Sequence, residues 1–254
     1  MDKSQFIGII PARYASTRFP AKPLALLGGK PVIQHVWDQV NQVLDNVVVA
    51  TDDERIADAV KRFGGNVVMT STAHRSGTDR CWEAYVNHGG HESVIINIQG
   101  DEPFIHRSQL QAIMACFDDE STDIATLVRP FDSSRPYAEL ENPNTAKVVV
   151  DAQMKAKYFS RSVIPFVRGV ERDQWPSRVQ YFIHIGLYAY RASVLESITQ
   201  IPQSTLELAE SLEQLRWLEN GYIIKTAISN VETIGIDTPE DLAKAEQYLK
   251  NHRL

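Results

Sequence analysis

The 254-residue sequence has only two cysteines, no long apolar run and no excess of positive charge. Cys81 and Cys116 belong to no Cys-x-x-Cys or Cys/His pattern, so we expect buried free thiols in a reducing, cytoplasmic compartment. The longest apolar runs are strand-sized, far short of the ~20 residues of a membrane span. No apolar signal segment precedes the first predicted strand. A net charge of −6 argues against a general nucleic-acid binder, so we expect neither a nucleic-acid nor a membrane partner.

Two common nucleotide-binding signatures are also missing. The chain contains no G-x-G-x-x-G and no G-x-x-x-x-G-K-[ST], so neither a dinucleotide-binding fold nor a P-loop is predicted. The run Gly28-Gly29-Lys30 is too short to form a Walker loop. Any phosphate site must therefore be built from the side chains and backbone amides of a different loop.

A strand followed by a basic loop stands at the start of the chain. Residues 6–10 form an apolar run typical of a strand buried on both faces, and Pro11 ends it. The next loop carries Arg13, Arg18 and Lys22. Three cations on one loop repel one another unless an anion lies between them, and arginine matches phosphate oxygens bidentately. The alternative is a solvated basic loop, but this position after a buried strand favours a triphosphate site.

Strands and helices alternate four times in the first half of the sequence. Further short apolar strands are predicted at 47–50, 67–69 and 94–98, each followed by helical periodicity. This rhythm predicts an α/β fold with a doubly wound, mostly parallel sheet. We expect one domain, 1–254, because no linker interrupts the chain.

The second half of the sequence has a different pattern, which predicts an inserted β-rich subregion. Its predicted strands are 124–128, 147–151, 157–161, 183–190 and 222–227. The segment 165–178, of mixed charge and aromatic content, is predicted to be a loop. Arg161 at the end of one strand and His184 at the start of another are, taken singly, more often structural than functional.

Two aspartates far apart in the sequence are candidate metal ligands. Asp101 follows the strand 94–98, where open α/β sheets place ligands, and Gly100 and Pro103 restrict its backbone. Asp237 lies between a strand and a helix-start signal, and its spacing fits a simple turn residue equally well. Mg²⁺ prefers one or two carboxylates together with substrate phosphates and water, so we expect both aspartates to converge on Mg²⁺.

A single helix is predicted over Leu206–Glu219, with two side-chain stripes. The first is apolar and faces the core: Leu208, Leu212 and Leu215. The second is polar: Glu207, Glu210 and Gln214. Polar groups aligned in this way could bind the hydroxyls of a sugar, but periodicity alone favours a solvated acidic face.

Segments distributed along the whole chain resemble one enzyme family. In order they are IIPARYASTRFPAKP ending at Pro23, VATDDERI (49–56), SGTDR (76–80), NIQGDEPFI (97–105), KVVVD (147–151), YFSRSVIPF (158–166), HIGLYAYR (184–191), SLEQLRWLENG (211–221) and GIDTPEDL (235–242). With these segments the chain closely resembles the 3-deoxy-manno-octulosonate cytidylyltransferases, also called CMP-Kdo synthetases, which activate Kdo for lipopolysaccharide biosynthesis.

The resemblance implies a nucleotidyltransferase that transfers CMP from CTP to 3-deoxy-D-manno-octulosonate (Kdo) and releases diphosphate. It implies Mg²⁺ on Asp101 and Asp237. The implied catalytic residues are Arg13, Arg18, Lys22 and Asp101. The implied nucleotide-binding residues are Pro11, Ala12, Arg13, Arg18, Lys22, Ser76 and Gly77. The implied sugar-binding residues are Gln99, Arg161, His184, Glu207, Glu210 and Gln214, with Arg161 a candidate for the sugar carboxylate.

The resemblance also implies a homodimer and a division of labour along the chain. Residues 1–128 would mainly bind the nucleotide and 129–230 would mainly bind the sugar and form the dimer. Residues 231–254 would supply the metal-ligand turn and a terminal helix.

Two residues depart from the family pattern. Ala21 replaces a usual glycine, which is tolerable if its φ is negative, and Ile183 replaces a basic residue. Enzymes for sialic acid, a methylerythritol phosphate or 8-amino Kdo would share the first loop and stay open as alternatives. A protein that binds CTP without turnover is the alternative from another class.

Overall fold

The computed structural model describes residues 2–15, 18–74, 76–232 and 234–252, and the chain divides into two compact units. Unit 1 comprises residues 1–111, 191–199 and 232–254. Unit 2 comprises residues 112–190 and 200–231. Among the described helices, none combines the length and the apolar character that crossing a membrane requires.

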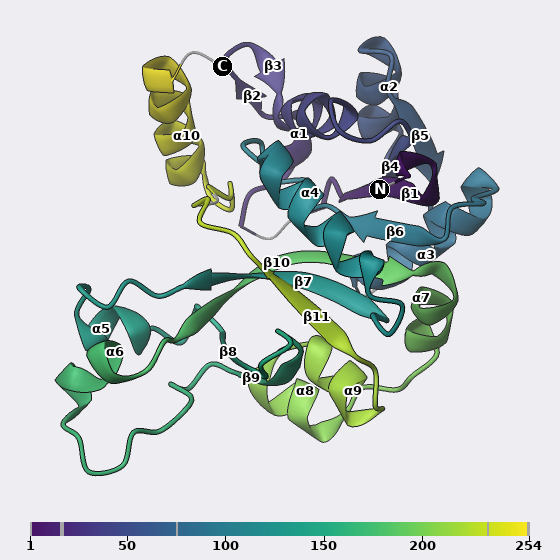
Figure 1. The fold of residues 1–254 in the computed structure, drawn as a ribbon. Coiled ribbons are helices and arrows are strands. Elements are labelled where there is room, and N and C mark those ends of the chain that lie inside the picture. Colours follow the sequence, from purple (N-terminus) through teal and green to yellow (C-terminus); the bar gives the residue numbers. More distant parts are fainter. Residues whose placement is uncertain (1, 16–17, 75, 233, 253–254) are drawn as a thin grey trace. The chain divides into compact units, whose positions relative to one another are not determined.

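Unit 1 is built on four parallel strands in the order β6-β1-β4-β5 (Figure 1). Their bounds are Phe6–Ala12 for β1, Val47–Thr51 for β4, Asn66–Met69 for β5 and Val94–Asn97 for β6. Every residue of β4 and β6 is buried, as is all of β1 except Pro11. Near-continuous apolar strands of this kind form parallel sheets whose faces are covered by helices.

Helices flank the strands of unit 1. They are α1 (Val32–Asn41), α2 (Glu54–Arg62), α3 (Gly77–His88), α7 (Ala192–Thr199) and α10 (Pro239–His252), and α4 (Arg107–Ala115) begins in unit 1 and ends in unit 2. Short elements complete the unit: η1 (Lys3–Gln5), η2 (Lys22–Leu24), β2 (Leu26–Leu27) and β3 (Lys30–Pro31). The lack of a side chain at Gly8 allows β1 to pack closely against Val40 and Leu44. A Cβ at this position would lie 2.9 Å from Leu44 and 3.1 Å from Val40.

Unit 2 contains the strands of the β-rich subregion. Their bounds are Ile124–Pro130 for β7, Lys147–Val150 for β8, Ala156–Ser160 for β9, Phe182–Arg191 for β10 and Ile224–Ile228 for β11. β11 runs parallel to β7, whereas β10 runs antiparallel to both β7 and β8, and β9 is antiparallel to β8. The predicted α/β fold with a mostly parallel sheet and inserted strands is thus confirmed.

The helices of unit 2 are short. They are η3 (Cys116–Asp118), α5 (Tyr137–Leu140), η4 (Arg172–Gln174), α6 (Trp175–Arg178), α8 (Thr205–Glu210) and α9 (Gln214–Glu219). The segment 165–178, predicted to be a loop, therefore contains two helical turns, which Trp175 anchors in the core at 3% exposure.

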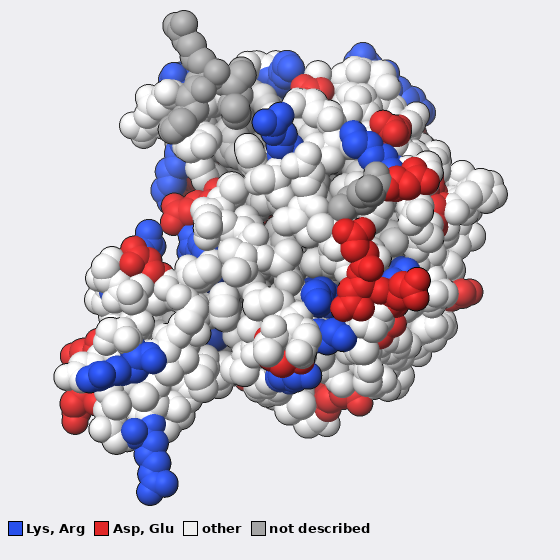
Figure 2. All heavy atoms as spheres, in the orientation of Figure 1, with Lys and Arg blue, Asp and Glu red and all other residues white. Residues whose placement is uncertain are grey.

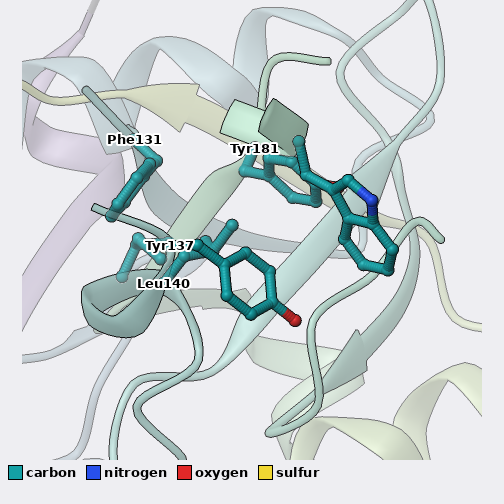
Figure 3. Packing of buried hydrophobic residues seen from close by; sticks show 6 residues of the cluster. Phe131, Tyr137, Leu140 and Tyr181 are labelled. Atoms are coloured by element: carbon teal, nitrogen blue, oxygen red, sulfur yellow. The ribbon is translucent and has the colours of Figure 1, made fainter. Parts of the chain in front are cut away.

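An aromatic cluster forms a core of its own in unit 2 (Figure 3). It consists of Phe131, Tyr137, Leu140, Trp175, Tyr181 and Ile183. The Tyr137 and Trp175 rings meet edge to face with centroids 5.6 Å apart, an arrangement that the ring quadrupoles favour. Ile183, which we noted as a departure from the pattern of the resembled family, is buried in this cluster.

The prediction of one helix over residues 206–219 is wrong. α8 ends at Glu210 and α9 begins at Gln214, because Ser211 adopts a left-handed conformation with φ of 52°. The predicted apolar stripe is wrong at Leu208, which is 61% exposed, although Leu212 and Leu215 are buried. The polar stripe is not a solvated face either, since Glu207 and Gln214 are buried.

Acidic and basic side chains are intermixed on the face of the molecule shown in Figure 2. This distribution agrees with the net charge of −6. It differs from the continuous basic surface that nucleic-acid-binding proteins usually present.

Candidate active site

A cavity of about 550 Å³ lies in unit 1, next to the carboxyl ends of β1 and β6. The predicted nucleotide and metal residues all line it: Pro11, Ala12, Arg13, Arg18, Lys22, Ser76, Gly77, Asp101 and Asp237. Gln99, predicted to bind the sugar, lines it as well. Its volume is in the range of small-molecule sites, and its position is the one where open α/β sheets bind ligands.

Gly100 allows the two strand ends to meet at this cavity. A Cβ on Gly100 would stand 2.6 Å from the carbonyl oxygen of Pro11, closer than any side-chain atom tolerates. The backbone after β6 therefore lies directly against the backbone at the end of β1. This close approach places Asp101 beside the basic loop.

Lys22 joins the two predicted metal ligands. Its Nζ donates to Asp101 Oδ2 at 2.6 Å and to Asp237 Oδ1 at 3.1 Å. Arg18 Nη2 lies 3.2 Å from the other oxygen of Asp237. The Ile236 amide also donates to the Asp101 carbonyl at 2.9 Å, so backbone and side chains hold the aspartates together.

The pair of carboxylates fits a hard divalent cation. Two ionised oxygens that already converge on one ammonium are the donor type that Mg²⁺ takes from proteins, with substrate phosphates and water completing its shell. The described residues contain no cluster of three or more histidine, cysteine or acidic side chains that would instead form an all-protein metal cage. Burial, helped by the charge of Asp101, raises the pKa of Glu102 to about 7, so Glu102 carries only part of a negative charge beside Asp101 near neutrality.

The start of α10 fixes the backbone of Asp237. Asp241 Oδ2 accepts hydrogen bonds from the amides of Asp237 and Thr238, at 3.3 Å and 3.2 Å. The Thr238 hydroxyl in turn accepts from the Asp241 amide at 3.2 Å. Hydrogen bonds from Thr238 hold the pKa of Asp241 below its usual value, which keeps this cap ionised. Asp237 is thus a rigidly held residue and its carboxylate is directed at Lys22 and Arg18.

Arg80 is a buried cation at the cavity that sequence reasoning did not select. Its side chain is 1% exposed and donates to Asp52 at 2.7 Å and to Thr70 at 2.6 Å. These contacts connect the N-terminal part of α3 to the loops after β4 and β5. The sequence feature that could have indicated Arg80 is its place in the segment SGTDR (76–80), which also contains the predicted residues Ser76 and Gly77.

Ala21 corrects one expectation. Its φ is 60°, in the left-handed region, so the negative φ that would make alanine harmless here is absent. The Ala21 amide donates to the Tyr14 carbonyl at 2.9 Å, and its carbonyl accepts from Leu24 at 2.9 Å. The turn that carries Lys22 requires this conformation, which for an L-residue other than glycine costs about 1–2 kcal/mol.

The predicted sugar-binding residues other than Gln99 lie in unit 2, and four of them are engaged by protein groups. Glu210 accepts from the Ser160 hydroxyl at 2.6 Å and from the Arg161 amide at 2.9 Å. The Arg161 guanidinium donates to the carbonyls of Glu210, Pro143 and Ser211. These contacts tie the end of β9 to the break between α8 and α9.

Glu207 has a structural partner as well. It forms a capping box with Ser204 at the start of α8 and lies 3.4 Å from Arg216 Nε. Its exposure is 6%, so this carboxylate is buried with a charge to balance it. The geometry accounts for Glu207 without a ligand.

His184 is a half-buried, neutral hydrogen-bond donor. Burial lowers its pKa to about 4. Thr126 donates its hydroxyl hydrogen to carbonyls of β10, so the contact of 3.0 Å between His184 Nε2 and Thr126 Oγ1 requires a hydrogen on Nε2. The ring packs between Phe159 and Tyr188, at centroid distances of 5.1 Å and 5.3 Å.

Buried polar atoms of unit 2 without a hydrogen-bond partner among the described residues include Tyr188 Oη, Gln214 Nε2 and Trp217 Nε1. The Tyr188 and Trp217 rings meet edge to face, 5.2 Å apart. Buried donors without partners mark a place where a water or a polar ligand binds. Tyr188 was missed because simple alternation makes it an ordinary strand residue. The register shift between Ile185 and Tyr188 changes that alternation.

The family of the chain follows from comparison with known proteins. The α/β sheet and its cavity define a nucleotide-binding type of fold, and the family model described as cytidylyltransferase matches residues 7–248. The chain belongs to the cytidylyltransferase family.

The names of similar proteins are more specific than the description of the family model. A protein of Phocaeicola vulgatus named 3-deoxy-manno-octulosonate cytidylyltransferase is 67% identical over 97% of this chain and 98% of its own length. One of the same name from Thermodesulfovibrio yellowstonii is 44% identical over 97% of this chain and 98% of its own.

A solved structure agrees with these relatives. CMP:2-keto-3-deoxy-manno-octonic acid synthetase complexed with CTP is 41% identical and covers 97% of this chain and 99% of its own, with a TM-score of 0.88. A 4-diphosphocytidyl-2C-methyl-D-erythritol synthase from Anaerococcus prevotii, at 16% identity and a TM-score of 0.56, shares the fold alone.

Because Ala21 is left-handed, we predict that Ala21→Gly stabilises the protein by about 0.5–1 kcal/mol. Glycine removes the strain that the Cβ causes in the folded protein, and this gain exceeds the loss from the greater conformational entropy of glycine in the unfolded chain. Urea unfolding measures this free energy. Ala25→Gly is the matched control, since Ala25 has a φ of −58° and gains nothing from glycine. Equal destabilisation by both substitutions would show that φ at Ala21 carries no strain.

The half-buried, neutral His184 predicts acid sensitivity. Its pKa is about 4 when folded against a usual 6.5, so only the unfolded chain takes up this proton as the pH falls below about 6.5, and stability is lost from there down to about 4. The wild type should lose about 2 kcal/mol more than His184→Asn between about pH 7 and pH 5. Urea titrations at each pH measure this difference.

The exposed His91, substituted as His91→Gln, is the control for that titration. Its unfolding free energy should fall with pH in parallel with the wild type. If His184→Asn also ran parallel to the wild type, the neutral state of His184 would be refuted.

Proposed function

We propose that this protein transfers the cytidylyl group of CTP to Kdo, giving CMP-Kdo and diphosphate, and so activates Kdo for lipopolysaccharide biosynthesis. The observation that carries the proposal is full-length identity, 67% to one relative with that activity in its name and 41% to a CTP-bound synthetase structure. The cavity of unit 1 supplies the complementary chemistry for the nucleotide.

The basic loop binds the triphosphate of CTP. Arg13, Arg18 and Lys22 line one cavity, so their charges act on one polyanion, and arginine forks bind phosphate oxygens in pairs. Pro11 and Ala12 at the end of β1, with Ser76 and Gly77 at the start of α3, contact the cytosine.

The reaction is an in-line displacement at the α-phosphorus. The oxygen of the Kdo anomeric hydroxyl forms the new bond to the α-phosphorus, the bond from that phosphorus to the bridging oxygen breaks, and diphosphate leaves with the bond's electron pair. The hydroxyl proton is released to solvent. Catalysis rests on positioning and on neutralising the charge that develops on diphosphate, for which Arg13, Arg18 and Lys22 are placed.

Mg²⁺ is the proposed cofactor, held by Asp101 and Asp237. When bound, it neutralises phosphate charge and helps to fix the geometry of the triphosphate. The contacts of Lys22 have to change in that state, because an ammonium and a divalent ion compete for the same carboxylate oxygens. With both carboxylates holding such an ion, the Lys22 ammonium would be available to the phosphates.

Kdo is bound by polar groups that have no charged partner. Tyr188 and Gln214 offer donors to sugar hydroxyls, and His184, whose Nε2 hydrogen goes to Thr126, packs against the Tyr188 ring in the same proposed set. Arg161 retains guanidinium hydrogens for the carboxylate beyond those it gives to backbone carbonyls. Gln99 and Glu210 complete the proposed set of sugar-binding residues. Glu207 contributes indirectly, because it caps the start of α8 and so stabilises that helix.

A cytoplasmic homodimer is the form in which we propose the enzyme acts. The two buried free cysteines agree with a reducing compartment. Light scattering of the purified protein, with an expected mass of twice 28.6 kDa, tests the dimer.

Product analysis with CTP, Mg²⁺ and a panel of acceptors tests the activity. We expect CMP-Kdo and equimolar diphosphate with Kdo, and little product with sialic acid, methylerythritol phosphate or 8-amino Kdo. Faster turnover of another acceptor would reassign the substrate. CTP binding without product from any acceptor would support a non-catalytic CTP-binding protein instead.

Asp101→Asn should lower the rate of diphosphate release by about 10²–10³-fold, the usual loss when one partner that stabilises developing charge is removed. Circular dichroism of the variant should match the wild type. Asp38→Asn is the control, because Asp38 pairs with Lys30 outside the cavity and should leave the rate unchanged. An Asp101→Asn enzyme with undiminished, Mg²⁺-dependent diphosphate release would remove Asp101 from the mechanism.

A further inference from the structure

Tyr14, within the basic loop, is held by a cation from α2. Arg55 Cζ lies 3.3 Å from the centroid of the Tyr14 ring, so the guanidinium stacks on the aromatic face. A guanidinium in that position is attracted by the ring quadrupole. Arg55 does not line the cavity, and the established part of the site gives it no role.

Asp53 fixes the orientation of Arg55. The carboxylate accepts from Arg55 Nε at 2.9 Å and from Nη2 at 2.6 Å, a bidentate pair. Asp53 is also the N-cap of α2 and accepts the Arg55 amide at 2.9 Å. The side-chain hydrogen bond from Arg55 lowers the pKa of Asp53, so the pair stays charged near neutrality.

Tyr14 also makes a backbone hydrogen bond across the base of the basic loop. Its carbonyl accepts the Ala21 amide at 2.9 Å, so one backbone hydrogen bond joins the two ends of the loop that carries Arg18. Arg13 precedes Tyr14 directly, and Lys22 follows Ala21. A ring held in place at Tyr14 therefore restrains the backbone from which all three phosphate-binding cations project.

We propose that Asp53, Arg55 and Tyr14 form a latch that holds the basic loop in its triphosphate-binding conformation. The proposal rests on the proposed function of the cavity and adds positioning residues that touch no substrate. If only a fraction of the molecules has the competent loop, the apparent dissociation constant for CTP rises by the inverse of that fraction. Loss of the latch should therefore weaken CTP binding and leave the chemical step of bound CTP unchanged.

Hydrogen exchange in the nucleotide-free protein tests the latch directly. In Arg55→Gln and Tyr14→Leu, the amide of Ala21 should exchange about 3–10-fold faster than in the wild type, because its acceptor is no longer held. Tyr14→Phe keeps the aromatic face and should exchange like the wild type. Unchanged exchange in Arg55→Gln and Tyr14→Leu would overturn the proposal, as would equal acceleration in Tyr14→Phe, which would assign the effect to the hydroxyl.

CTP titration and kinetics give the second readout. The dissociation constant and the KM for CTP should rise about 3–10-fold in Arg55→Gln and Tyr14→Leu, with kcat within about twofold of the wild type. The double variant should bind no more weakly than either single variant, since both remove one interaction. Additive losses would contradict a shared latch.

The matched control is Lys61→Gln, which removes one positive charge from the last turn of α2 at an exposed position. Weaker CTP binding in Lys61→Gln, equal to that in Arg55→Gln, would assign the effect to net charge and overturn the latch. Failure to make CMP-Kdo would refute the proposed function while the exchange of the Ala21 amide still decides the latch.

Discussion

An ammonium between two carboxylates is the interaction on which the candidate site depends. Lys22 contacts Asp101 and Asp237, which come from segments 136 residues apart in the numbering. Two carboxylates this close repel each other, and the charge of Lys22 balances them before any substrate arrives. The same three groups thus join distant segments of the chain and line the cavity.

The two units contain polar groups of different chemistry. The cavity in unit 1 offers charges, three cations and two carboxylates, which suit a triphosphate and a divalent ion. Unit 2 contains buried neutral polar groups without a hydrogen-bond partner among its described residues, Tyr188 Oη and Gln214 Nε2, which suit the hydroxyls of a polyol. A site with unpaired neutral donors discriminates strongly, because an acceptor lacking the matching oxygen leaves those donors buried and unsatisfied.

Local sequence patterns were sufficient for the sheet and for the nucleotide cavity. Apolar runs at 6–10 and 47–50 are buried strands, and the strand-loop pattern at Arg13, Arg18 and Lys22 lies on one cavity. These features depend on residues close in sequence and on the rule that parallel strands present their carboxyl ends at one edge.

Features that depend on distant contacts or on single backbone angles could not be predicted. The helix over 206–219 breaks at Ser211, and Glu210 beside the break accepts from Ser160, 50 residues away. Ala21 adopts the left-handed conformation because the turn before Lys22 requires it, and no periodicity reports that. Glu207 caps α8 and pairs with Arg216. Helical spacing alone could not distinguish this structural role from that of a ligand-binding carboxylate.

A double-mutant cycle on Lys22 and Asp101 tests the central interaction most directly. The free energies of urea unfolding would be compared for the wild type, Lys22→Met, Asp101→Asn and the double variant, without metal or nucleotide. A direct, partly buried ion pair predicts a coupling energy of about 1 kcal/mol or more. Additivity within about 0.3 kcal/mol would contradict the account, because Lys22 would then not hold the aspartates in the free protein.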